Sequence, residues 1–265
     1  MTTITSPKNP KVKNALRLRR GKYRRAEQAV LVDGARELLR ALDAGIRLTE
    51  AFVCPELCRT EDAQQLLARL PDAAEQVFEV TGPVFDRLAF GERREGVVAI
   101  AATPELALDD MKLSDSPLLF VLEGVEKPGN IGAVARTADA IGADALIAAD
   151  AMCDLYSHNA IRSSLGTLLT SQICQAETPA VLDWLRSREV KIFAARVDGS
   201  VDYTECDFTG PAAIILGSEA DGLTEQWQGD DICAIRLPML GIADSLNVSV
   251  SAAVIGYEAL RQRRG

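Results

Sequence analysis

Short apolar segments alternate with helix-forming segments along almost the whole chain, and this alternation limits the possible fold more than any other sequence feature. It is typical of layered α/β domains, in which helices cover a largely parallel sheet. The chain has 265 residues, of which 48% are hydrophobic, enough for one large core or two smaller ones. We therefore expect an α/β protein with buried parallel strands.

The alternation is interrupted once, at residues 103–116, an acidic stretch (TPELALDDMKLSDS) with no clear period. We expect a linker here, between an N-terminal domain of residues 1–102 and a C-terminal domain of residues 117–265. In the N-terminal domain we expect helices near 8–20, 34–42, 61–69 and 83–89, and strands at 29–32, 51–53, 76–80 and 96–101. In the C-terminal domain we expect strands at 118–122, 145–148, 168–174, 191–195, 212–216 and 233–237, and helices at 130–141, 159–164, 179–187 and 245–263. The pattern alone predicts a doubly wound C-terminal sheet with its ligand at the carboxyl ends of the strands.

Charge is distributed unevenly along the chain. The net charge is −9, yet residues 1–40 carry +8 and the remaining residues −17. Such a basic block attracts phosphate whatever the total charge, although charge runs are most often only the solvated face of a helix. Val12, Ala15 and Leu16 predict a helix with one apolar face, which suits both interpretations. The candidate RNA-binding residues are Lys8, Lys11, Lys13, Arg17, Arg19, Arg20, Lys22, Arg24 and Arg25.

Other classes of site are disfavoured. The six cysteines are scattered without a C-x-x-C pair, and His158 is the only histidine. We therefore expect reduced thiols, no zinc or other metal site, and no catalytic triad. No apolar stretch reaches the roughly 18 residues of a membrane span, and the first residues do not resemble a signal peptide. We expect a cytoplasmic protein.

Three stretches of the C-terminal half place small or polar residues after apolar strands. They are PGNIGAVARTADA (128–140), IILGSEADGLT (214–224) and a stretch at 235–260 that contains PMLG and SLNVSV. Each has a simple structural explanation: glycines permit turns, Asn130 and Ser245 can cap helices, and Glu219 suits a helix start. Three such stretches at strand ends together indicate one composite site.

These residues resemble the three signature motifs of the SpoU/TrmH family of RNA ribose 2′-O-methyltransferases, within the SPOUT class. The first stretch is similar to P-x-N-x-G-x-x-x-R-T-A, the second to G-S-E-x-x-G-L, and the third to I-P-M followed by S-L-N-V-S-V-A. Residues 162–166 (RSSLG) resemble the family element R-A-S-x-G. The N-terminal half resembles the family's substrate-binding domain through Ser6, Asn9-Pro10, the basic helix and residues 31–34. Lys127 departs from the family pattern, in which an acid often precedes the proline.

The resemblance implies a C-terminal SPOUT-type catalytic domain with a trefoil knot, a homodimer, and a smaller N-terminal α/β domain similar to RNA-binding ribosomal proteins. It implies methyl transfer from S-adenosylmethionine to a ribose 2′-hydroxyl. The implied catalytic residues are Asn130, Arg136, Glu219, Ser245 and Asn247. The implied cofactor-binding residues are Leu216, Gly217, Leu237, Met239, Ser245 and Leu246. An arginine stays charged, so holding a phosphate or stabilising the forming alkoxide suits Arg136 better than acting as a base.

Several functions remain open at this point. Ribosomal RNA, 23S or another, is the expected substrate because the chain carries a separate basic N-terminal domain. The alternatives are a tRNA methyltransferase, an antibiotic-resistance rRNA methyltransferase, and an RNA-binding or ribosome-assembly protein without catalysis. A nicotinamide dehydrogenase is disfavoured because no G-x-G-x-x-G follows the first strand of the C-terminal half.

Overall fold

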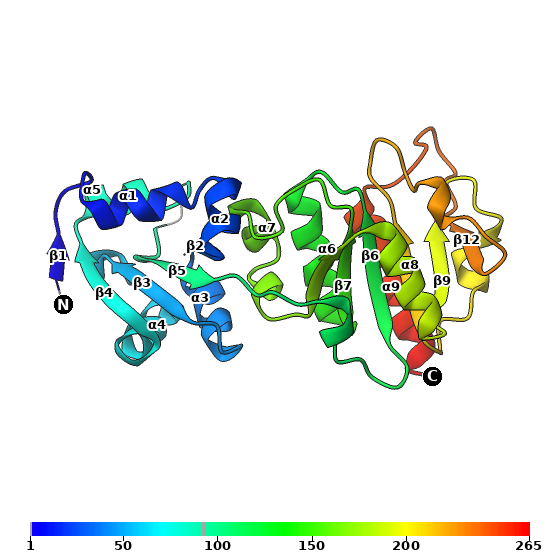
Figure 1. Cartoon of the computed structure of the whole chain (residues 1–265), viewed down its shortest axis with the longest axis horizontal. Coiled ribbons are helices and arrows are strands. Elements are labelled where there is room, and N and C mark those ends of the chain that lie inside the picture. The colour runs from blue at the N-terminus through cyan, green and yellow to red at the C-terminus, as the bar shows by residue number, and fades with distance from the viewer. Residues whose placement is uncertain (1, 92–93) are drawn as a thin grey trace. The chain divides into compact units, whose positions relative to one another are not determined.

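The computed structural model describes residues 2–91 and 94–265. Its contacts divide the chain into two compact units. The N-terminal unit comprises residues 1–104 together with 155–170, and the C-terminal unit comprises 105–154 and 171–265 (Figure 1). None of the helices in the described part of the chain combines the length and the apolar character needed to cross a membrane.

The N-terminal unit contains a five-stranded mixed sheet in the order β1-β4-β3-β5-β2. Strands β1, β4 and β3 run parallel, and β5 is antiparallel to both β3 and β2. Apolar residues alternate in direction along β2, so Leu31 packs on one face of the sheet, while Val30 and Val32 pack on the other. The strands are β1 (Thr2–Ile4), β2 (Ala29–Asp33), β3 (Leu48–Val53), β4 (Ala74–Val80) and β5 (Val97–Ala102).

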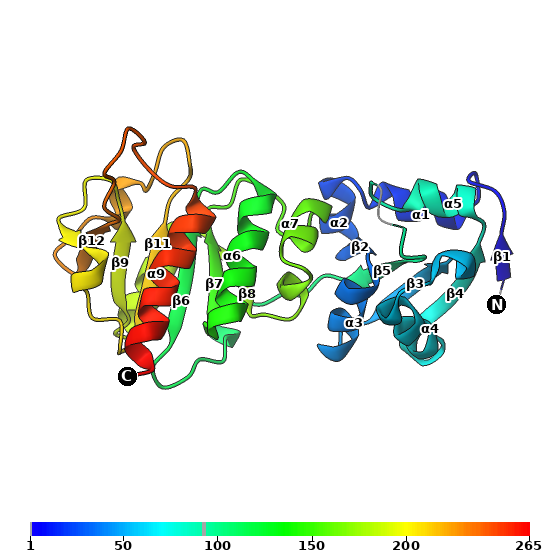
Figure 2. The same cartoon turned by 180° about the vertical axis from the view of Figure 1, so that it is seen from behind.

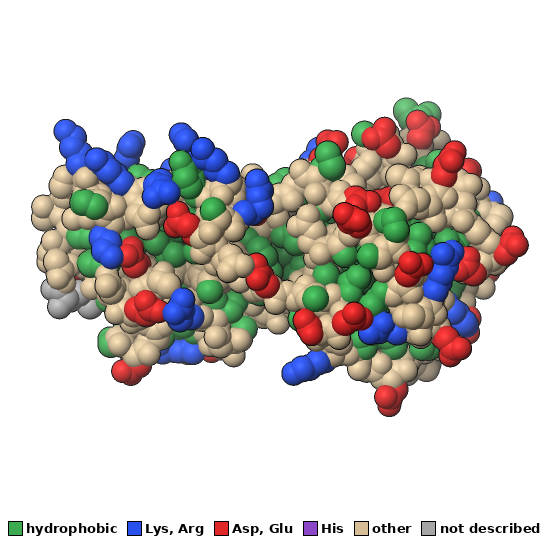
Figure 3. Space-filling view, viewed as in Figure 1, with side chains coloured by type: hydrophobic (Ala, Val, Ile, Leu, Met, Phe, Trp, Pro, Cys, Tyr) green, Lys and Arg blue, Asp and Glu red, His purple; other side chains and the backbone are tan. Residues whose placement is uncertain are grey.

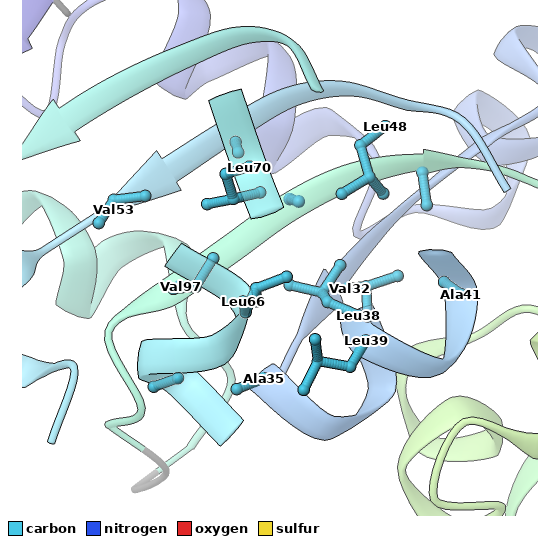
Figure 4. Close-up of a cluster of buried hydrophobic side chains, with 14 of the residues drawn as sticks. Val32, Ala35, Leu38, Leu39, Ala41, Leu48, Val53, Leu66, Leu70 and Val97 are labelled. Atoms are coloured by element: carbon cyan, nitrogen blue, oxygen red, sulfur yellow. The ribbon is translucent and has the colours of Figure 1, made fainter. Parts of the chain in front are cut away.

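Helices cover both faces of this sheet. Helices α1 (Pro10–Arg17) and α5 (Gly82–Leu88) pack on one face around Phe52, Val12 and Phe85. On the other face lie α3 (Ala35–Asp43) and α4 (Glu61–Ala73), which bury the cluster of Figure 4. The helix expected near 8–20 is shorter, because α1 ends at Arg17, and a second helix that was not expected, α2 (Gly21–Glu27), follows it.

The segment 155–170 belongs to the N-terminal unit although it is flanked in sequence on both sides by residues of the C-terminal unit. Its helix α7 (His158–Ser163) contacts the edge strand β2, and its short helix η3 (Thr167–Leu169) contacts α3. The guanidinium of Arg40 donates a hydrogen bond to the carbonyl of Leu165 at 2.6 Å. The division thus differs from the expected boundaries, 1–102, 103–116 and 117–265. Part of the strand expected at 168–174 is η3, and β8 runs over Ile173–Ala176.

The C-terminal unit is built on seven parallel strands in the order β10-β12-β9-β11-β6-β7-β8. A doubly wound sheet would add each later strand outside the earlier ones. Here β11 lies between β6 and β9, and β12 lies between β9 and β10, so the simple winding expected from the pattern is wrong. The strands besides β8 are β6 (Leu118–Glu123), β7 (Ala145–Ala149), β9 (Lys191–Ala195), β10 (Val201–Asp202), β11 (Ala212–Leu216) and β12 (Ile232–Arg236).

Helix α8 (Thr178–Ser187) packs on one face of this sheet, where residues 105–116 also lie. Buried Met111 and the partly buried Leu113 belong to that core, so most of the expected linker is packed against the C-terminal unit. Helices α6 (Pro128–Ile141) and α9 (Val248–Arg263) lie side by side on the opposite face (Figure 2). Gly256 permits this packing, because a Cβ there would lie 2.8 Å from side-chain atoms of both Ile141 and Phe120.

Two helix starts differ from expectation. Helix α6 begins at Pro128 after Lys127, so Asn130 lies in the first turn rather than at the cap. Helix α9 begins at Val248, and its N-cap is Asn247, whose side chain accepts a hydrogen bond from the Ser249 amide at 3.0 Å. This shift releases Ser245 from capping and leaves it in the preceding loop.

Candidate active site

A cavity of about 1140 Å³ opens at the carboxyl ends of β9, β11 and β12 in the C-terminal unit. All residues expected to bind the cofactor line it, although they come from two separate segments, the end of β11 with the loop after it and the loop between β12 and α9. They are Leu216, Gly217, Leu237, Met239, Ser245 and Leu246. The parallel arrangement explains this convergence, because the carboxyl ends of neighbouring strands lie at one edge of a sheet.

The loop after β11 forms a small closed hairpin along one wall of the cavity. The amides of Ser218 and Gly222 each donate to the other residue's carbonyl at 3.1 Å, and the Asp221 amide donates to Ser218 Oγ at 3.0 Å. A Cβ on Gly217 would lie only 2.1 Å from the carbonyl carbon of Gly222. Only glycine therefore fits at this position, and Glu219 is carried at the exposed tip of the hairpin.

A buried carboxylate anchors this hairpin. Glu123, the last residue of β6, is 3% exposed. Its Oε2 accepts a hydrogen bond from the Thr224 amide at 2.8 Å, and its Oε1 accepts from the Thr224 hydroxyl at 2.7 Å and from the Thr178 hydroxyl at 3.2 Å. Sequence reasoning missed Glu123, although an acid at the end of a fully apolar strand is a signal that could have found it.

The beginnings of α6 and α9 bring two expected catalytic residues together. The side-chain amide of Asn247 donates to Asn130 Oδ1 at 3.4 Å. The nitrogen of the Asn130 side-chain amide, Nδ2, is buried and has no hydrogen-bond partner among residues 2–91 and 94–265. Asn247 and Lys127 both line the cavity, and both are exposed. Asn247 therefore links the cavity wall to a second amide whose donor is unused.

The five expected catalytic residues divide into two groups. Glu219, Ser245 and Asn247 line the cavity, whereas Asn130 and Arg136, both on α6, are not among the lining residues. Arg136 is exposed. It is free of ion pairs and hydrogen bonds to other side chains within the described part of the chain. The guanidinium is thus available to a molecule that approaches α6 from solvent.

The cavity also has lining residues that sequence reasoning did not single out. Arg196 and Asp198, in the loop after β9, form a two-bond ion pair at 2.8 and 2.9 Å. The hydrogen bonds from Arg196 hold the pKa of Asp198 below its ordinary value. A charged pair in a loop carries no periodic signal, so only the fold places it at this wall.

The nine basic residues expected to bind RNA do not form one equivalent set. Arg24 is 7% exposed and donates a hydrogen bond to the carbonyl of Leu18 at 2.7 Å, so its side chain stabilises the interior of the unit. Lys11 pairs with Glu50 at 2.6 Å, and Arg19 donates to three carbonyls at the end of α5. The other six are exposed on the side of the unit formed by α1, α2 and α5, where Figure 3 shows Lys and Arg side chains gathered. They are Lys8, Lys13, Arg17, Arg20, Lys22 and Arg25.

Comparison with known proteins identifies the family to which the chain belongs. The model of the SpoU rRNA Methylase family matches residues 117–257, more than half of the chain and the whole of the cavity. The chain belongs to the SpoU rRNA methylase family. Residues 9–99 match a second model, the MRM3-like substrate binding domain. The resemblance found in the sequence motifs is thereby confirmed.

Relatives of known name extend over most of the chain. The 23S rRNA (guanosine(2553)-2′-O)-methyltransferase RlmP of Bacillus subtilis is 27% identical over 97% of this SpoU protein and 98% of its own length. The 23S rRNA (uridine(2479)-2′-O)-methyltransferase of Streptomyces viridochromogenes is 34% identical, over 66% of this chain and 64% of that protein.

Solved structures show the same architecture. A crystal structure of an RNA 2′-O ribose methyltransferase covers 100% of both chains with a TM-score of 0.87 and 40% identity. The SpoU methyltransferase AviRb from Streptomyces viridochromogenes, in complex with AdoMet, gives a TM-score of 0.88 at 28% identity, covering 97% of this chain and 99% of that one. The expected fold class, a catalytic α/β domain with a smaller N-terminal α/β domain, is confirmed.

Proposed function

We propose that this protein methylates a ribose 2′-hydroxyl of ribosomal RNA, with S-adenosylmethionine as methyl donor. The observation that carries the proposal is the convergence of all six expected cofactor residues on one cavity, within the segment that matches the SpoU family. Relatives named as 23S rRNA 2′-O-methyltransferases support the reaction and the substrate class. The cytoplasm is the proposed location because rRNA is the substrate.

The cavity fits S-adenosylmethionine in chemistry and in size. Its volume, about 1140 Å³, accommodates a ligand of this class. Leu216, Leu237 and Met239 offer apolar contacts for an adenine, and Gly217 lets the backbone approach closely. Bound S-adenosylmethionine supplies an electrophilic methyl group carried on a sulfonium.

The protein's own task is to position the hydroxyl and to help its proton leave, because the pKa of a ribose hydroxyl lies far above neutrality. Asn130 and Asn247 form the amide pair suited to hold the ribose: Asn247 lines the cavity, and Asn130, whose buried Nδ2 has no partner among the described residues, accepts a hydrogen bond from it. Glu219 and Ser245, at the cavity, can accept hydrogen bonds from the ribose. Arg136 stabilises negative charge that develops on the oxygen or on a neighbouring phosphate.

The protein acts as a homodimer in this proposal. Val250 and Tyr257 of α9 are 46% and 52% exposed, on the helix that lies beside α6. A second copy covering this face would bury these side chains and would close the site around the exposed Arg136. The return of β11 and β12 into the middle of the sheet supports the knotted topology of the family.

A map of ribose 2′-O-methylation in cells with and without the gene tests the substrate. Loss of methylation at one rRNA position would establish the reaction, and loss at a tRNA position would favour the alternative substrate. If deleting the gene removes rRNA methylation only in antibiotic-resistant strains, the protein is an antibiotic-resistance rRNA methyltransferase. If S-adenosylmethionine does not bind, the chain is a non-catalytic RNA-binding or assembly protein.

Arg136→Ala tests the catalytic assignment. We expect methyl transfer to fall by about 10²-fold or more, with S-adenosylmethionine affinity unchanged, because Arg136 lies outside the cavity. Arg261→Ala is the matched control, since Arg261 is exposed on α9 and pairs only with Glu258 within the described residues. Equal loss of activity in both variants would contradict the assignment.

A further inference from the structure

Three aromatic and cationic side chains form a stack in the N-terminal unit. The Arg19 guanidinium lies 4.6 Å from the centroid of the Phe90 ring, and the His158 ring lies 3.8 Å from it at an interplanar angle of 8°. His158 begins α7, so the segment 155–170 supplies one member of the stack and the N-terminal sequence supplies the other two.

Hydrogen bonds hold this stack in place. Arg19 Nη2 donates to the carbonyls of Arg87, Leu88 and Ala89 at 2.9, 3.2 and 2.8 Å. The Phe90 amide donates to Asp33 Oδ2 at 2.6 Å. These bonds use the last carbonyls of α5, so the stack is a built part of the unit rather than a chance surface contact.

Two further arginines lie next to the stack. Arg162 Nη1 is 3.5 Å from the position that a Cβ on Gly91 would occupy, directly after Phe90. The charge of Arg87 acts on Arg19, which also donates a hydrogen bond to the Arg87 carbonyl. Both side chains are exposed, and neither pairs with a carboxylate in the part of the chain that the structure describes.

The electrostatics agree with this placement. Burial, followed by the charges of Arg162 and Arg19, lowers the pKa of His158 to about 4, so the imidazole is neutral at pH 7. Burial and the charge of Arg87 lower the pKa of Arg19, while Asp33 opposes this shift. Arg87 therefore repels Arg19, and Arg162 and Arg19 both act on a neutral imidazole, so this cluster would favour an anion.

We propose that Arg87 and Arg162, beside the stack of Arg19, Phe90 and His158, bind a phosphate of the RNA backbone. This inference rests on the proposed function, because it takes RNA as the ligand. Guanidinium groups bind phosphate through paired N–H donors, and both are free to do so here. The Phe90 ring already contacts the side chains of Arg19 and His158 and does not offer a free face on which a base could stack. The groups left to bind a ligand are the guanidinium groups, which favour a phosphate over a base.

RNA is the ligand favoured by the surroundings. The stack shares Arg19 with the segment that carries the exposed Arg17, Arg20 and Lys22, so the proposed subsite continues that basic face. The segment 155–170 thus adds a cation, Arg162, to the RNA surface of a unit to which it does not belong in sequence.

His158 provides a direct reporter, because it is the only histidine in the chain. The tag-free full-length protein, labelled at histidine, gives one set of imidazole signals by nuclear magnetic resonance. We expect a 23S rRNA fragment to shift these signals, and we expect Arg162→Gln to abolish the shift. Inorganic phosphate is titrated separately; a shift with phosphate but none with RNA would overturn the proposal.

Binding measurements over a range of salt concentrations test the role of the two arginines. Arg162→Gln and Arg87→Gln should each weaken RNA binding by about three- to tenfold and reduce the salt slope by about one. Arg69→Gln on α4 is the matched control, because Arg69 pairs with Asp43 on the other helix layer, and it should change neither quantity. Arg162→Lys keeps the charge and should retain most of the affinity, which separates charge loss from misfolding.

The outcomes separate this subsite from the proposed function. If the wild type binds RNA and both glutamine variants bind with the same affinity and salt slope, the subsite is refuted and the proposed function stands. If the wild type neither binds RNA nor transfers methyl groups to it, the proposed function fails as well. Reduced RNA affinity together with unchanged S-adenosylmethionine affinity supports the subsite.

Discussion

Replacing Glu123 by glutamine would test whether one buried carboxylate sets the shape of the cofactor cavity. Glu123 accepts three hydrogen bonds, two from Thr224 at the end of the hairpin and one from Thr178 on the side of α8. Glutamine keeps the volume but removes the charge and places an NH₂ group opposite a donor. The hairpin should therefore lose its anchor while the sheet remains intact.

The magnitude follows from these contacts. A hydrogen bond to a charged group contributes about 1.5–3 kcal/mol and a neutral one about 0.5–1.5 kcal/mol, so three bonds weaken by about 3 kcal/mol together. The lower cost of burying a neutral side chain offsets part of this loss, which leaves a destabilisation of about 1–2 kcal/mol. If about 1.4 kcal/mol of it falls on the hairpin, S-adenosylmethionine affinity drops about tenfold.

Thr178 and Thr224 offer a matched comparison. Thr178→Val removes only the 3.2 Å bond on the α8 side, so stability should fall by about 1 kcal/mol with cofactor affinity unchanged. Thr224→Val removes the 2.7 Å bond on the hairpin side and should lower cofactor affinity. Urea unfolding and calorimetric titration with S-adenosylmethionine measure the two quantities. Equal effects of both valine variants on cofactor affinity, or an unchanged affinity in Glu123→Gln, would refute the reasoning.

Three other changes have defined outcomes. Gly217→Ala should lower S-adenosylmethionine affinity by at least about tenfold in calorimetry, since its Cβ would overlap Gly222, whereas Gly210→Ala, with nothing within 4 Å, should not. Arg263→Met removes four hydrogen bonds to loop carbonyls at 2.6–3.2 Å, and urea unfolding should show a loss of about 2–4 kcal/mol. The folded-state pKa of His158 is about 4, below its ordinary 6.5, so the unfolded chain binds the proton more tightly than the folded chain does. The contribution of His158 to stability is therefore full above pH 6.5 and is lost as the pH drops to 4. Because the side chain is partly exposed, we expect the free energy of unfolding to fall by only about 1–2 kcal/mol over this range. His158→Phe should remove this pH dependence, and an unchanged dependence would contradict it.

The sequence predicted local structure and the lining of the cavity, because both depend on short-range patterns. Apolar runs located β6, β9 and β11 within a residue or so, and the second and third motifs placed Gly217, Met239 and Leu246 at one cavity. The order of the strands could not be predicted from periodicity, because a strand has the same apolar pattern whichever strands lie next to it. The insertion of β11 between β6 and β9 therefore leaves no trace in the sequence of these strands.

Other features depend on contacts between residues far apart in sequence. Arg24 looks like its basic neighbours in the sequence, and only the fold shows that it is buried against Leu18. The cap of α9 moved from Ser245 to Asn247 because both residues are good caps and their spacing does not decide between them. Arg136 was expected at the site, yet its position outside the cavity lining emerges only from the arrangement of α6.

The division of the N-terminal unit between two stretches of sequence has a consequence for synthesis on the ribosome. Residues 1–104 emerge first, but Ile161 and Leu169 complete their core, so this core stays partly uncovered until residue 170 has been translated. By then β6 and β7 of the second unit have already been made. The first half of the protein to be translated thus cannot finish folding before the second half has begun.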